Sequence, residues 1–85
     1  MYLNIRNKGF MNIKNKIGLR IKHFRQKNNV SQEILSFNCG LDRTYISGVE
    51  RGKRNISIIN LEKICDALNV TLKIFFDDEV FDESK

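Results

Sequence analysis

The sequence predicts an all-α domain of five helices. Its 85 residues contain no proline, and no segment combines the alternating apolar pattern and tight turn of a β-hairpin. Apolar residues instead recur every three or four positions along most of the chain, as they do in helices that bury one face. A chain of this length holds one domain with a modest core, and short connections between such helices are typical of a bundle.

The first helix is predicted over residues 13–28. One apolar stripe runs along it at spacings of four, four and three: Ile13, Ile17, Ile21 and Phe24. The basic residues of this segment fall mostly on its other faces: Lys14, Lys16, Arg20, Lys22 and Lys27. Asn28 and Asn29 are suited to end the helix, because asparagine tolerates the left-handed conformation.

Two short helices with a glycine-containing turn are predicted next. Ser31 is suited to cap a helix over 31–38, and Asp42 is suited to open another over 42–51. The turn between them is Cys39-Gly40-Leu41, in which glycine is free to adopt a positive φ. Such a pair is the helix-turn-helix pattern, although similar corners also occur in bundles that bind no DNA. The side chains expected to hold these helices in position are Leu35, Leu41, Ile46 and Val49.

Two further helices complete the prediction. Ser57 is suited to cap the fourth, whose apolar stripe is Leu61, Ile64, Cys65 and Leu68, and Thr71 to cap a short fifth helix. The last region has more apolar side chains than a short helix needs for its own core. We therefore expect them to form a dimer interface: Val70, Leu72, Ile74, Phe75 and Phe76. The alternative is that all of them fold back inside one chain.

The predicted organisation has three parts. Residues 1–12 show no clear period and are expected to form a flexible N-terminal arm. Residues 13–76 form the helical domain, and residues 77–85 form an acidic C-terminal tail. Met11 stands directly before the first helix and is an alternative translation start to Met1.

Charge is unevenly distributed along the chain. Residues 1–76 carry 14 Lys or Arg and 5 Asp or Glu, whereas residues 77–85 carry five Asp or Glu and one Lys. A basic small domain suggests a polyanionic partner, and a merely Lys-rich, soluble surface is the alternative. No run of 18 or more apolar residues is present, which argues against a membrane span, and no secretion signal is recognisable. We expect a cytoplasmic protein.

No residue pattern indicates catalysis or a bound metal. Cys39 and Cys65 are 26 positions apart and neither belongs to a Cys-x-x-Cys pair, so we expect reduced thiols that pack as small apolar groups. His23 has no second ligand at metal-binding spacing, and no serine lies in a Gly-x-Ser-x-Gly context. The sequence therefore predicts no metal site, no cofactor and no enzyme activity.

The outward side chains of the 42–51 helix are suited to DNA. Early positions of a recognition helix contact base edges, and these are Arg43, Thr44, Tyr45 and Ser47. Arginine donates two hydrogen bonds to guanine, threonine offers a methyl or hydroxyl group, and tyrosine and serine reach phosphates or bases. A basic loop follows that is suited to the phosphate backbone: Arg51, Lys53, Arg54 and Asn55.

These residues carry a resemblance to a known family. SQEILSFNCGLDRTYISGVERGKRN resembles the λ-repressor-like, Cro/cI-type (XRE) helix-turn-helix family. Within it, LDRTYISGVERGKRNISI followed by LEKICDALNVTLKIFF resembles the controller proteins of restriction–modification systems. The resemblance covers about residues 13–76. It implies a λ-repressor-like fold and a homodimer on a pseudo-palindromic operator, which controls its own gene and restriction–modification genes. RNA polymerase is a candidate further partner.

The resemblance also implies roles for single residues. Gln32 would bond phosphate and brace the recognition helix, Arg43 would read guanine, and Arg54 and Asn55 would grip the backbone or the minor-groove edge. The implied structural pair is Arg25 with Glu50, which would tie the first helix to the end of the third. Alternatives to a controller are a phage-type repressor or an antitoxin, and, more distantly, a helix-turn-helix used only for protein–protein contact.

Overall fold

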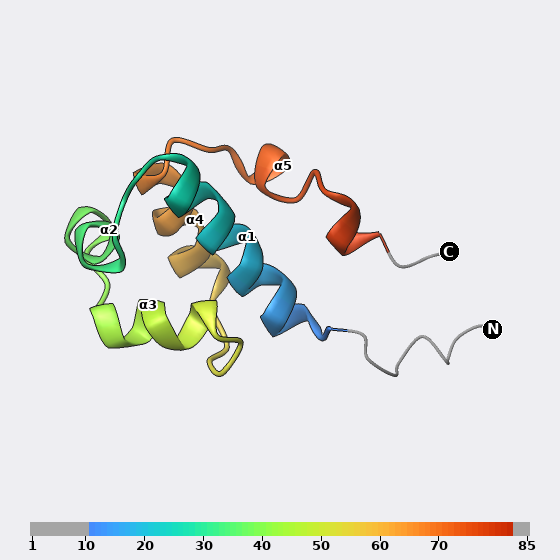
Figure 1. The fold of residues 1–85 in the computed structure, drawn as a ribbon, viewed down its shortest axis with the longest axis horizontal. Helices are drawn as coiled ribbons and strands as arrows, with labels where there is room; N and C mark the ends of the chain where they lie inside the picture. Colours follow the sequence, from blue (N-terminus) through green and yellow to red (C-terminus); the bar gives the residue numbers. More distant parts are fainter. Residues whose placement is uncertain (1–10, 83–85) are drawn as a thin grey trace.

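The computed structural model describes residues 11–82, which form five α-helices and one short 3-10 helix (Figure 1). Their order is α1 (Ile13–Lys27), α2 (Gln32–Cys39), α3 (Arg43–Glu50), α4 (Ile58–Ala67), α5 (Leu72–Phe75) and η2 (Glu79–Phe81). The predicted five-helix, all-α fold is confirmed. The expected N-terminal arm lies outside the described residues, apart from Met11 and Asn12.

Every α-helix begins at a side chain that caps its first turn. The capping oxygen accepts a hydrogen bond from a backbone N–H two or three residues later, at Asn12, Ser31, Asp42, Ser57 and Thr71. The caps predicted for the last four of these helices are confirmed. Gly40 ends α2 with a φ of 74°, a left-handed conformation that glycine adopts without strain. The Ser36 hydroxyl donates to the carbonyl of Leu41 across the same turn.

The core lies between α1, α2, α3 and α4. Its most completely buried side chains come from every α-helix: Ile21, Leu35, Ile46, Ile64 and Phe75. α3 packs against both α1 and α2, and α2 also packs against α4. α3 is therefore held in place by two helices, because α1 and α2 both contact it.

Gly18 allows α1 to lie directly against the end of α3. A Cβ atom built on Gly18 would lie 2.5 Å from the carbonyl oxygen of Val49 and 2.6 Å from that of Glu50. Both contacts are with backbone, which cannot move aside as a flexible side chain can. The spacing of the two helices therefore requires glycine at this position, a role that no local sequence pattern indicates.

Two basic residues of α1 are buried although they lie off its predicted apolar stripe. Lys16 and Arg20 are 7% and 8% exposed. Arg20 Nε donates to the carbonyl of Phe75 at 2.8 Å, and its Nη2 donates to that of Ile74 at 3.1 Å. The carbonyls at the end of a helix lack partners within it and attract positive charge. Arg20 is thus buried because it caps the end of α5.

The chain after Phe76 returns to the domain. The sequence predicts an acidic tail over 77–85, and within it the structure places η2 beside α1. The Phe81 ring lies 4.9 Å from that of Phe76, and Asp78 Oδ1 lies 3.6 Å from Arg20 Nη1. The acidic segment is therefore packed on the helices as far as Asp82, and residues 83–85 lie outside the described part.

The structure buries some residues of the expected dimer interface and exposes others. Phe75 is 0% exposed and Val70 is 8% exposed within one chain, so neither has surface to offer a partner. Phe75 packs α5 against Phe24 of α1, with 6.2 Å between the two ring centroids. Both residues therefore belong to the monomer core, contrary to the sequence prediction. Leu72 is half-buried, whereas Ile74 and Phe76 are 52% and 42% exposed.

Candidate nucleic-acid interface

The candidate site is centred on the outer face of α3. Ile46 and Val49 are buried beneath this helix, while Arg43 and Thr44 at its start are exposed. Figure 1 shows α3 along the lower edge of the bundle, with α1, α2 and α4 above it. The first turn of the predicted recognition helix is therefore accessible to a large partner.

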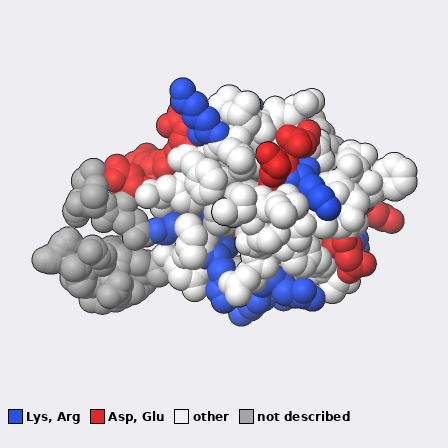
Figure 2. Space-filling model, turned by 180° about the vertical axis from the view of Figure 1, so that it is seen from behind, with Lys and Arg blue, Asp and Glu red and all other residues white. Residues whose placement is uncertain are grey.

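Positive charge gathers on the same side of the molecule. Figure 2 shows Lys and Arg side chains along the lower edge, the height at which Figure 1 places α3 and the loop after it. The basic residues of α3 and this loop are all exposed: Arg43, Arg51, Lys53 and Arg54. A surface of this sign attracts phosphate, and its binding weakens as salt is added.

The basic loop is folded back onto α3 by its backbone. Gly52 adopts a φ of 74° and its N–H donates to the carbonyl of Val49 at 3.0 Å. The N–H of Lys53 donates to the carbonyl of Gly48 at 2.9 Å. These bonds hold the loop beside the helix, so its exposed side chains extend the basic surface of α3.

Tyr45 links the recognition helix to the loop and to α4. Its hydroxyl donates a 3.4 Å hydrogen bond to the carbonyl of Asn55 and accepts a 3.2 Å hydrogen bond from Asn60 Nδ2. Tyr45 is half-buried, in contrast with the outward, DNA-facing position that the sequence predicts. Ser47 is also half-buried. Asn60 was not among the predicted site residues, because nothing in the sequence relates it to a tyrosine 15 positions away.

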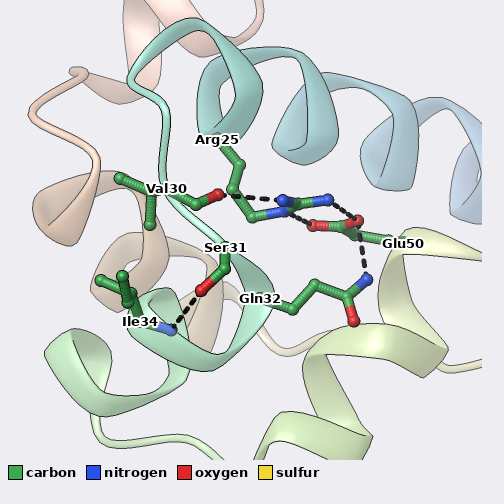
Figure 3. A network of polar contacts seen from close by, with 6 residues as sticks. All are labelled: Arg25, Val30, Ser31, Gln32, Ile34 and Glu50. Carbon is green, nitrogen blue, oxygen red and sulfur yellow. Dashed lines mark hydrogen bonds and ion pairs between the residues drawn. The ribbon is translucent and has the colours of Figure 1, made fainter.

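An ion pair fixes the end of α3. Arg25 Nε donates to Glu50 Oε2 at 2.6 Å and Nη2 donates to Oε1 at 2.9 Å, with side-chain exposures of 12% for Arg25 and 4% for Glu50. The hydrogen bond that Arg25 donates to Glu50 raises the pKa of Arg25 above its usual value, against the opposing effect of burial. Arg25 Nη1 also donates to the carbonyl of Val30 at 2.9 Å (Figure 3). The pair that the resemblance implies thus joins α1, α3 and the segment before α2.

Gln32 joins the same network from the start of α2. Its Nε2 donates to Glu50 Oε1 at 3.0 Å (Figure 3). An amide nitrogen has two N–H groups, so this bond leaves Gln32 a second donor. The side chain therefore joins α2 to α3 through Glu50.

Other chemistry finds little support in residues 11–82. They contain no group of three or more His, Cys, Asp or Glu side chains that could hold a metal ion. Both cysteines are free, and burial raises the pKa of the Cys65 thiol to about 11, so this thiol is protonated at neutral pH. No helix in this part of the chain is long and apolar enough to cross a membrane.

Comparisons of the sequence and of the fold with known proteins point to the same family. The helix-turn-helix family model matches residues 21–75. The control protein C.BamHI of Bacillus amyloliquefaciens is 49% identical over 67 residues, which are 78% of this chain and 83% of that relative. Two solved controller structures are similar in fold. The restriction–modification controller C.AhdI of Aeromonas hydrophila is 43% identical, with a TM-score of 0.72 over 74% of this chain and 96% of that one.

The second is the controller protein C.Esp1396I, solved as a tetramer in complex with its natural 35 base-pair operator. It is 42% identical, with a TM-score of 0.72 over 75% of this chain and 84% of that one. The family match spans α2, α3 and α4, which carry or position the surface described above. The chain therefore belongs to the XRE-type helix-turn-helix family of DNA-binding transcription regulators, and is similar to the controller proteins of restriction–modification systems.

Proposed function

We propose that this protein binds an operator as a homodimer, with α3 in the major groove, and regulates its own gene and linked restriction–modification genes. The observation that carries the proposal is the exposed first turn of α3, with Arg43 and Thr44, beside a basic loop that is hydrogen-bonded to the same helix. A rigid helix with a basic flank fits a groove lined by phosphates. The similarity to the control protein C.BamHI supports restriction–modification genes as the class of genes that is regulated.

The side chains divide into three proposed roles. Arg43, Thr44, Tyr45 and Ser47 contact bases and nearby backbone, although the half-buried Tyr45 and Ser47 offer less surface for this. The phosphate contacts are made by Gln32, Arg51, Lys53, Arg54 and Asn55. Arg25 and Glu50 contact no DNA and hold α3 in place. Because the proposed partner is an operator, we place the protein in the cytoplasm with the DNA. Where it activates transcription, RNA polymerase is a further partner.

A footprint on DNA upstream of the protein's own gene tests the proposal. We expect protection of two related half-sites, with affinity that falls steeply as salt rises. Binding that ignores salt, or no protection, would favour a helix-turn-helix used for protein contact. A neighbouring methyltransferase and endonuclease gene supports a controller, whereas phage genes or a toxin gene would favour a repressor or an antitoxin.

Replacing Arg43 with alanine is expected to weaken operator binding by roughly 1–3 kcal/mol and to relax the preference at one base pair. Titration of the footprinted duplex and a scrambled duplex at one salt concentration measures both effects. Lys22→Ala is the control, because it removes an exposed positive charge from α1 instead. Equal losses on both duplexes for Arg43→Ala would make Arg43 a phosphate contact.

We propose that the partner chain covers the apolar walls of a groove between the start of α1 and the start of α4, rather than Phe75. The groove has a volume of about 430 Å³, and its exposed apolar walls are Ile13, Ile58 and Phe76, which are 58%, 79% and 42% exposed. Arg54 and Asn55 also line this groove and belong to the proposed DNA surface, so we expect the partner to contact the apolar walls alone. Exposed apolar walls of this kind are unusual on a monomer surface and common at interfaces. The tetramer of C.Esp1396I shows that a similar chain self-associates.

Ile58→Glu is expected to weaken the dimer at least about tenfold, because it places an unpaired charge in an apolar contact. Sedimentation at several concentrations measures this, and thermal unfolding of the variant shows that it folds. Ile34→Glu is the matched control, since Ile34 is 51% exposed on α2 and does not line the groove. An unchanged sedimentation profile for Ile58→Glu would place the interface elsewhere.

A further inference from the structure

Arg54 lies directly on the backbone of the recognition helix. A Cβ atom built on Gly48 would lie 2.7 Å from Arg54 Cγ and 3.6 Å from its Nε. The three nearest atoms to that position all belong to Arg54, so this side chain packs into the space that glycine leaves open. Gly48 is nevertheless inside a helix, where glycine is less favourable than alanine.

Tyr45 contacts the same arginine from the preceding turn of α3. Residues three apart share one face of a helix, and the Arg54 guanidinium carbon lies 5.6 Å from the centroid of the Tyr45 ring. A cation at this distance over an aromatic face is attracted to it. Tyr45 and Gly48 together, which we call the Arg54 seat, therefore support the stem and the head of one exposed arginine.

Asn60, on α4, contacts the Tyr45 side chain of the Arg54 seat. Its Nδ2 donates to the Tyr45 hydroxyl at 3.2 Å, and this hydroxyl donates to the carbonyl of Asn55 beside Arg54. The loop that carries Arg54 is fastened to Gly48 by the N–H of Lys53 at 2.9 Å. The position of Arg54 is thus set from α3, from α4 and from its own loop.

We propose that Gly48 and Asn60 are positioning residues for DNA binding. They hold Arg54 against α3, in an orientation that suits contact with the DNA phosphate backbone. This backbone flanks the major groove that Arg43 enters. The inference rests on the proposed function, since it requires α3 to face DNA. An arginine that is already ordered in the free protein loses less side-chain freedom on binding. A larger residue at position 48 would displace Arg54 from this orientation.

Gly48→Ala separates this role from a structural one. Alanine is the better helix former, and the nearest atom to its Cβ, Arg54 Cγ, belongs to an exposed side chain that can rotate about its first side-chain bond, so the melting temperature should change little. Operator affinity should fall about threefold to tenfold, the cost of ordering one long side chain on binding. Gly18→Ala is the matched control: its Cβ meets backbone, so it should lower the melting temperature.

Two double variants test whether Gly48 acts through Arg54 and whether Asn60 acts through the Tyr45 hydroxyl. In an Arg54→Ala background, Gly48→Ala should cost no further operator affinity, because the displaced side chain is already gone. In a Tyr45→Phe background, Asn60→Ala should likewise add nothing, because the hydroxyl that it holds is absent. Additive losses in both pairs, unchanged affinity for Gly48→Ala, or a melting temperature that falls with its affinity would overturn the proposal. Failure of the unmodified protein to bind the same footprinted duplex would instead refute the proposed function.

Discussion

Glu50→Ala is expected to lower the free energy of unfolding by about 3–5 kcal/mol, because it leaves the Arg25 guanidinium largely buried without its carboxylate. Arg25 would keep its bond to the carbonyl of Val30, and Gln32 would lose its partner on Glu50. For a small domain this is a large part of the total stability, which is typically about 5–15 kcal/mol. Urea unfolding at fixed protein concentration measures the change.

The control for Glu50→Ala is Glu62→Ala, which removes an exposed carboxylate from α4. It should change the free energy of unfolding by less than about 1 kcal/mol. The double variant Arg25→Met, Glu50→Leu should recover most of the loss, since an apolar pair of similar volume often replaces a buried ion pair without cost. A loss below about 1 kcal/mol for Glu50→Ala would contradict the structural role of the pair.

Phe75→Ala should have an effect of similar size, about 3–5 kcal/mol, because it empties a fully buried position in the core of the single chain. The cavity would lie against Phe24 and Phe81, so α5 and η2 would lose their shared packing. Unfolding should be followed at several protein concentrations, because dimer formation makes apparent stability depend on concentration.

Phe76→Ala is the matched variant, one residue along and 42% exposed. We expect it to change the free energy of unfolding less than Phe75→Ala and the sedimentation profile more. The reverse order, with Phe75→Ala affecting only self-association, would return Phe75 to the interface and remove it from the monomer core.

The helices and their ends were predictable because they depend on local chemistry. Caps such as Ser31 and Asp42 act within three residues of the chain, and the stripes that include Ile21 and Ile64 report which face each helix buries. The exposure of Arg43 follows from the same periodicity, since it lies off the buried stripe of α3.

What the sequence could not predict depends on contacts between distant parts of the chain. Arg20 looks like a surface residue until α5, 54 positions later, presents its carbonyls to it. The periodicity around Phe75 shows an apolar face without showing whether its own chain or a partner covers it. Gly18 and Asn60 have no local signal, because their neighbours come from other helices.

The contact at Gly18 has a consequence for the DNA sequences that the dimer tolerates. Because α1 touches the backbone of α3 there, and Arg25 grips Glu50 from the same helix, the tilt of α3 relative to its own domain is fixed. In the proposed two-fold dimer, the distance between the two copies of α3 then depends on the interface between the chains and on no bending within them. An extra base pair between half-sites shifts them by about 3.4 Å and rotates them by about 35°. We therefore expect such a dimer to bind wrongly spaced operators poorly even when each half-site is perfect.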